Sequence, residues 1–237
     1  MPELGAALLV PSDSDSTAIM LYPGDIGDVQ RDSVTVLTAG ALSARARIDT
    51  ANSDAQCGDA PLVRIAGAQA GWSAGFIQMS ATPLATDSIE SMTARDSARL
   101  AADVARLASG VSSLMATSFR GLPFVVVSAH RMRWTTRDVL VAHLVRRLNQ
   151  EASPREEHTL LIAERDSAAT PYAVVFSERS EGTEETAEHF DVLSALRAGS
   201  SLVLVIARDQ DARTEYDLLE RPASGAWRVR WTRTVGC

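Results

Sequence analysis

One short segment of the chain has the residue types and spacing of a catalytic motif. Gly71-Trp72-Ser73-Ala74-Gly75 matches G-x-S-x-G, in which a sharp turn between a strand and a helix exposes a nucleophilic serine. A serine hydrolase that uses Ser73 is therefore one hypothesis. The flanking sequence favours a glycine-flanked turn instead, because residues 67–70 make a poor strand and residues 76–82 resemble a strand, where the motif needs a helix.

The histidines lie too far apart in the sequence to form a metal motif. No H-x-x-x-H or H-x-H spacing occurs, and the two cysteines are far apart. The spacing predicts no metal site, although a cluster could assemble across neighbouring strands. The chain has no glycine-rich phosphate loop, so we expect no cofactor. The four histidines are His130, His143, His158 and His189.

Charge is the clearest bulk property of the chain. All 23 basic residues are arginine, which excludes chemistry that needs a lysine, and the net charge is −7. Residues 1–60 are acidic, whereas residues 120–147 carry an excess of arginine. The overall balance argues against nucleic acid, but the basic segment suits an unknown protein or anionic partner. We therefore expect a non-enzymatic binding or accessory module. Its candidate binding residues are Arg131, Arg133, Arg146 and Arg147.

The two cysteines bear on the cellular compartment. Cys57 lies in a polar loop, which favours a disulfide to Cys237 over a buried free thiol. Such a bond predicts an extracytoplasmic bacterial protein, periplasmic or secreted. Two free thiols would indicate the cytoplasm instead. We recognise no signal peptide and no apolar run long enough for a transmembrane segment.

A long amphipathic helix is predicted in the middle of the chain. Asp87 and Glu90 have the spacing of a capping box, so the helix is expected to begin near Ser88. Apolar residues then recur at spacings of three, four and seven, which places them on one face. That stripe contains Ile89, Met92, Leu100, Val104, Leu107, Val111 and Leu114.

The remaining patterns indicate strands. Alternating and β-branched segments separated by polar turns predict an α+β fold, with a mainly antiparallel sheet, hairpins or a meander in the C-terminal half, and the helix packed on it. We expect a single domain over residues 1–237, with 1–60 loosely built and 61–237 forming the core. Residues 183–197 have helix end signals, yet their alternation also allows a strand. A turn at 222–225 predicts a hairpin that places Leu218 opposite Val229 and Asp217 opposite Arg230.

Overall fold

The contacts of the chain divide it into two compact units. In this computed structural model, unit 1 contains Met1–Ala85, Leu193–Ile206 and Ala212–Cys237, and unit 2 contains Thr86–Val192 and Ala207–Asp211. The prediction of a single domain stays a prediction, and each unit is described by itself. The structure describes residues 4–12, 16–21, 33–38, 41–112, 118–149 and 154–236.

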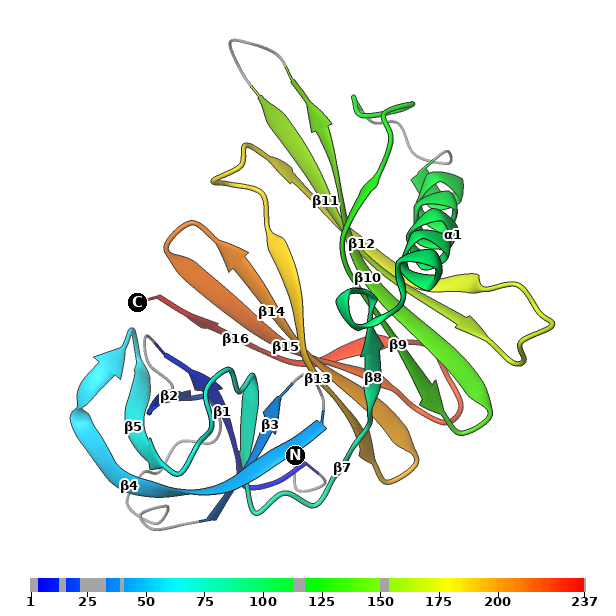
Figure 1. Cartoon of the computed structure of the whole chain (residues 1–237). Helices are drawn as coiled ribbons and strands as arrows, with labels where there is room; N and C mark the ends of the chain where they lie inside the picture. Colours follow the sequence, from blue (N-terminus) through cyan, green and yellow to red (C-terminus); the bar gives the residue numbers. More distant parts are fainter. Residues whose placement is uncertain are drawn as a thin grey trace. The chain divides into compact units, whose positions relative to one another are not determined.

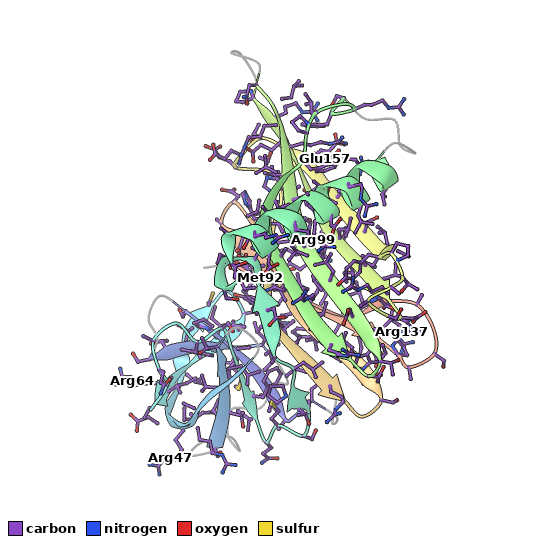
Figure 2. The ribbon with its side chains drawn as sticks, turned by 45° about the vertical axis from the view of Figure 1, so that its right-hand side comes forward. Arg47, Arg64, Met92, Arg99, Arg137 and Glu157 are labelled. Carbon is purple, nitrogen blue, oxygen red and sulfur yellow. The ribbon has the colours of Figure 1, made fainter. Side chains whose placement is uncertain are left out.

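Unit 1 contains a closed six-stranded barrel, with strand order β1-β2-β5-β4-β3-β6 (Figure 1). Its interior is apolar because alternate residues of each strand point inward; Val34, Ile48 and Val63 are buried there. Arg47 and Arg64 lie on the solvent side (Figure 2). The strands are β1 Ala7–Pro11, β2 Thr17–Met20, β3 Ser33–Thr38, β4 Ala41–Cys57, β5 Ala60–Ala66 and β6 Ala74–Ile77.

The first sixty residues therefore contain most of this barrel. Strands β1 to β4 come from the segment that composition describes as loosely built. A short strand between polar loops shows little hydrophobic periodicity in the sequence. Closure of the barrel gives the backbone groups of each edge strand a hydrogen-bonding partner.

Unit 2 contains a five-stranded antiparallel sheet with strand order β12-β11-β10-β9-β8. Helix α1, Ala94–Ser112, lies across one face of this sheet (Figure 1). Leu100, Val104 and Leu107 of α1 pack in one cluster with Leu140, Leu144 and Leu161 of the sheet. The strands are β8 Thr86–Ser88, β9 Val125–Trp134, β10 Arg137–Leu148, β11 Arg155–Arg165 and β12 Ala173–Gly182.

The predicted helix exists, but it begins later than the capping-box pattern indicates. Thr93 is its cap, since the Thr93 hydroxyl accepts a hydrogen bond from the Asp96 amide at 3.2 Å. Ser88 caps only a short 3₁₀ helix, η2 Ile89–Ser91. Asp87 is not a cap, because its carboxylate pairs with Arg131 at 2.9 Å.

A second five-stranded sheet has the order β16-β15-β14-β13-β7. The residues of β13 and β14 are divided between the two units. Neighbours in the chain pair as hairpins in both five-stranded sheets, but the expected meander is only part of a larger β-structure with a barrel and two separate sheets. The strands are β7 Thr82–Pro83, β13 His189–Ala198, β14 Ser201–Gln210, β15 Arg213–Arg221 and β16 Arg228–Val235.

Two local predictions need correction. Residues 183–187 form a turn and β13 follows, so the helix favoured by the end signals of 183–197 is wrong. The C-terminal hairpin pairs Leu218 with Trp231 and Asp217 with Thr232, because its loop is longer than expected and a bulge follows Leu218. Among the described residues, no helix is long and apolar enough to cross a membrane.

Candidate functional site

Three histidines and one glutamate that are distant in sequence meet on the face of the unit 2 sheet opposite to α1. His143 lies on β10, and Glu156 and His158 lie two residues apart on β11, so both point to the same side. Because Val145 pairs with His158, His143 is a diagonal neighbour of His158. His189, at the start of β13, completes the group, with its ring centroid 4.2 Å from that of His158.

A line of short contacts connects these side chains. His143 Nε2 lies 2.8 Å from His158 Nδ1, and His158 Nε2 lies 2.8 Å from a carboxylate oxygen of Glu156. Arg147 donates from Nε to the other oxygen of that carboxylate. At the far end, the backbone of Phe190 makes a hydrogen bond to His143 that favours the protonated ring, as a carbonyl acceptor does.

Burial keeps the two central imidazoles neutral. Desolvation, aided by His158 and His189, lowers the pKa of His143 from 6.5 to about 3. Desolvation also lowers the pKa of His158, although the hydrogen bond to Glu156 partly offsets it. Burial raises the pKa of Glu156, but hydrogen bonds from Arg147 and His158 outweigh it and hold that pKa below its ordinary value. The cluster therefore combines neutral imidazoles with a carboxylate anion.

A different ionic cluster lies on the α1 face of the same two strands. Arg146 and Glu157 pair across β10 and β11 through two hydrogen bonds of 2.7 and 3.0 Å, and Arg179 adds a third at 3.0 Å. The Arg146 and Glu157 side chains are 2% and 0% exposed. This cluster is a buried ion-pair network that solvent does not reach at Arg146 and Glu157.

A groove of about 630 Å³ lies beside α1 in unit 2. Arg99 on α1 and Met92, which precedes α1, both line the groove and are labelled in Figure 2. The Tyr172 hydroxyl, also in the lining, is buried without a hydrogen-bond partner among the described residues. The charged residues of the lining are Asp87, Asp96, Asp103, Arg99, Arg131 and Arg165.

The four arginines that the sequence singles out do not form one surface. Arg131 lines the groove and pairs with Asp87. Arg133 is exposed and lies outside the groove lining. Arg146 is buried in its ion pair, and Arg147 belongs to the histidine cluster. Alternation along a strand explains this division, because neighbouring residues such as Arg146 and Arg147 point to opposite faces.

Ser73 lies in unit 1, whereas all four histidines lie in unit 2. The Ser73 hydroxyl donates to the Leu193 carbonyl at 2.6 Å, and strand β6 follows it directly. No histidine or carboxylate hydrogen-bonds to Ser73 among the described residues. A nucleophile elbow needs a helix after the serine and a base beside it, so this geometry favours the turn interpretation.

Cys57 ends β4 and is buried and disulfide-bonded. Its predicted partner, Cys237, lies outside the described residues, so the Cys57–Cys237 pairing stays a prediction. The end of the described chain is close by, since a Cβ atom on Gly58 would approach the Gly236 carbonyl oxygen to 3.2 Å.

The spacing of the histidines predicted no metal site, because no single segment contains the cluster, and assembly across neighbouring strands was left only as an alternative. The one local signal is Glu156-x-His158 on a strand, which places two ligand-type side chains on one face. Comparisons with protein-family models, curated proteins and solved structures find no significant match.

Proposed function

We propose that this protein is a non-enzymatic binding module, and that the groove beside α1 receives a segment of a partner protein. The mixed charge of the groove supports this proposal. Small-molecule pockets are lined mostly by apolar side chains, whereas six charged residues line this one. Charged, solvent-exposed contacts are typical of the rim of a protein interface, where they set specificity and association rate.

The charges indicate what the partner segment presents. Arg99 is exposed and forms no ion pair with the described residues, so it is available to an acidic side chain. Asp96, one helical turn earlier, is exposed; one carboxylate oxygen accepts from the Thr93 hydroxyl at 2.8 Å, and the other can accept from a basic side chain. A segment with one acidic and one basic group matches this lining.

Reversing the charge of Arg99 tests the proposal. The full chain serves as bait in its native organism, and partners are quantified by mass spectrometry at low and high salt. Arg99→Glu should lower capture of the partner about tenfold, or ~1.4 kcal/mol, with the loss largest at low salt. Arg133→Glu is the matched control, because Arg133 is exposed in the same unit but lies outside the groove. Equal capture by both variants contradicts a partner site in the groove.

The cellular compartment of the protein is a second part of this proposal. A disulfide at Cys57 is compatible with an oxidising environment, and we propose that the protein acts outside the bacterial cytoplasm. Intact mass before and after reduction, on protein taken from its native compartment, tests this directly. Two freely alkylated thiols would place it in the cytoplasm instead.

A further inference from the structure

The buried histidine cluster has the donors and the spacing of a metal centre. One ligand atom from each of Glu156, His158 and His189 lies within 4.8 Å of the other two. Zinc–nitrogen bonds are about 2.0–2.1 Å long, so tetrahedral ligands lie about 3.3 Å apart. His158 and Glu156 are already within 2.8 Å of each other. Only His189, which is half-buried at the beginning of β13, has to approach.

Each of these three side chains already has the outer contact that a metal ligand needs. Ligating histidines donate their second ring N–H to an acceptor, and ligating carboxylates accept further hydrogen bonds. His158 meets His143 through Nδ1, and Glu156 accepts from Arg147 on one oxygen, which leaves the other for an ion. His189 Nε2 lies 3.4 Å from the Glu184 carbonyl oxygen, an acceptor of the kind that orients a ligating imidazole.

The line of short contacts also brings ligand-type atoms together at its Glu156 end. The line from the Phe190 backbone through His143 and His158 to Glu156 has three links, with an acceptor at each end. The link between His158 Nε2 and the Glu156 carboxylate, 2.8 Å long, joins two atoms of the kinds that coordinate transition metals. A metal ion between His158 and Glu156 fills that link. The His158 Nδ1–H then donates to His143, and His143 donates to Phe190.

We propose that Glu156, His158 and His189 bind one divalent transition-metal ion, with zinc as the best match, and that His143 orients His158 for this role. Two imidazoles and one carboxylate are a common zinc ligand set, and a fourth position is left for water. His143 is a positioning residue because its contact runs through His158. The proposal is independent of the groove, which has other residues on the opposite face of the sheet.

Zinc titration of the metal-free full chain tests the site. After dialysis against a chelator, wild-type protein should bind one equivalent of Zn²⁺ in competition with a chromophoric indicator. His189→Ala should weaken binding by about 100-fold or more, and His143→Gln by about 10–100-fold. His130→Ala is the control, since His130 lies on β9 of the same unit and outside the cluster. Wild-type binding no tighter than that of His189→Ala overturns the proposal.

Spectroscopy on the wild-type protein tests the metal site without variants that could fail to fold. Replacement of zinc by Co²⁺ should produce the visible absorption of a tetrahedral site. X-ray absorption at the zinc edge should report two imidazole ligands and only nitrogen or oxygen donors. A spectrum without imidazole ligands, or a loss of affinity in His130→Ala equal to that in His189→Ala, shows that the cluster is a hydrogen-bonded network only.

Discussion

The two faces of the β10–β11 hairpin carry two ionic clusters of opposite character. Arg146 and Glu157 lie on the α1 face, whereas the adjacent residues Arg147 and Glu156 lie on the histidine face. Sequence neighbours therefore belong to different environments. The Arg146 side chain is 2% exposed and the Arg147 side chain is 52% exposed.

The difference lies in which side chains hold each carboxylate. Glu157 receives three guanidinium hydrogen bonds from two arginines, so both of its oxygens are held by cationic side chains. Glu156 has one guanidinium on one oxygen and, on the other, one imidazole, a side chain that also binds metals. We interpret the carboxylate held by arginines alone as structural, and the one beside imidazoles as part of the proposed metal site. The following changes test this distinction.

Removing Arg146 should have the largest effect. Arg146→Met removes the two-point guanidinium partner of the Glu157 carboxylate, which is 0% exposed, and the expected loss of unfolding free energy is about 3–5 kcal/mol. Arg147→Met is the matched control on the next residue. The Arg147 side chain is 52% exposed, and Glu156, at 9%, keeps its contact with His158, so the expected cost is smaller, about 1 kcal/mol. Urea denaturation measures both, and similar losses would remove the contrast between the clusters.

Gly182 connects the histidine face to the turn that precedes β13. A Cβ atom at this position would lie 2.6 Å from the Thr186 hydroxyl and 2.7 Å from the Ala187 amide nitrogen. Gly182→Ala should therefore displace residues 183–187, cost about 1–3 kcal/mol in unfolding free energy, and weaken zinc binding by moving His189.

Gly110→Ala is the reference for that change. A Cβ atom there meets nothing within 4 Å and Gly110 lies within α1, so the substitution should stabilise by about 0.5–1 kcal/mol and leave zinc binding unchanged. Full zinc affinity in Gly182→Ala would show that the turn does not position His189.

Glu220 of unit 1 extends the comparison to a third carboxylate. Burial raises the pKa of Glu220, but the hydrogen bond from Arg228 and the charge of Arg230 outweigh it and lower the pKa overall. A lowered folded-state pKa adds stability above the unfolded-state pKa, and this stability disappears as pH falls through the folded value. Glu220→Gln should cost about 1–2 kcal/mol at pH 7.

The pH profile separates this charge effect from lost packing. The difference between wild type and Glu220→Gln should shrink as pH falls below about 4.5. Glu215→Gln is the control, because its carboxylate is more exposed and contacts Thr234 at 3.3 Å. A difference that stays constant from pH 7 to pH 3, measured by denaturation, would contradict an ionic role for Glu220.

Local patterns predicted the elements better than their boundaries. The stripe from Leu100 to Leu107 forms the buried face of α1, as expected from its period. The start was misplaced because two capping sequences follow one another, and Thr93 rather than Asp87 has the geometry of a cap. Residues 183–197 have the end signals of a helix, but strand pairing and burial determine their structure. Phe190 and Leu196 of β13 are fully buried.

The candidate sites show a similar limit. Arg131 was predicted as a binding residue, and it lines the groove proposed to bind a partner. Arg146 is also an arginine of the basic segment 120–147, but the alternation of side chains along its strand places it in the interior. The alternation was visible in the sequence. Which face would be covered was not, because that depends on how α1 packs.

The sequence by itself determined the residue chemistry and the periodicity: arginine as the only strong base, a long amphipathic helix, and antiparallel hairpins among chain neighbours. Tertiary structure decided the barrel closure, the sheet order and the meeting of His143, His158 and His189. Strand pairing between distant segments depends on register and on what covers each face, and neither is encoded within a single local window. For that reason widely spaced histidines, which show no metal motif in the sequence, converge in one buried cluster.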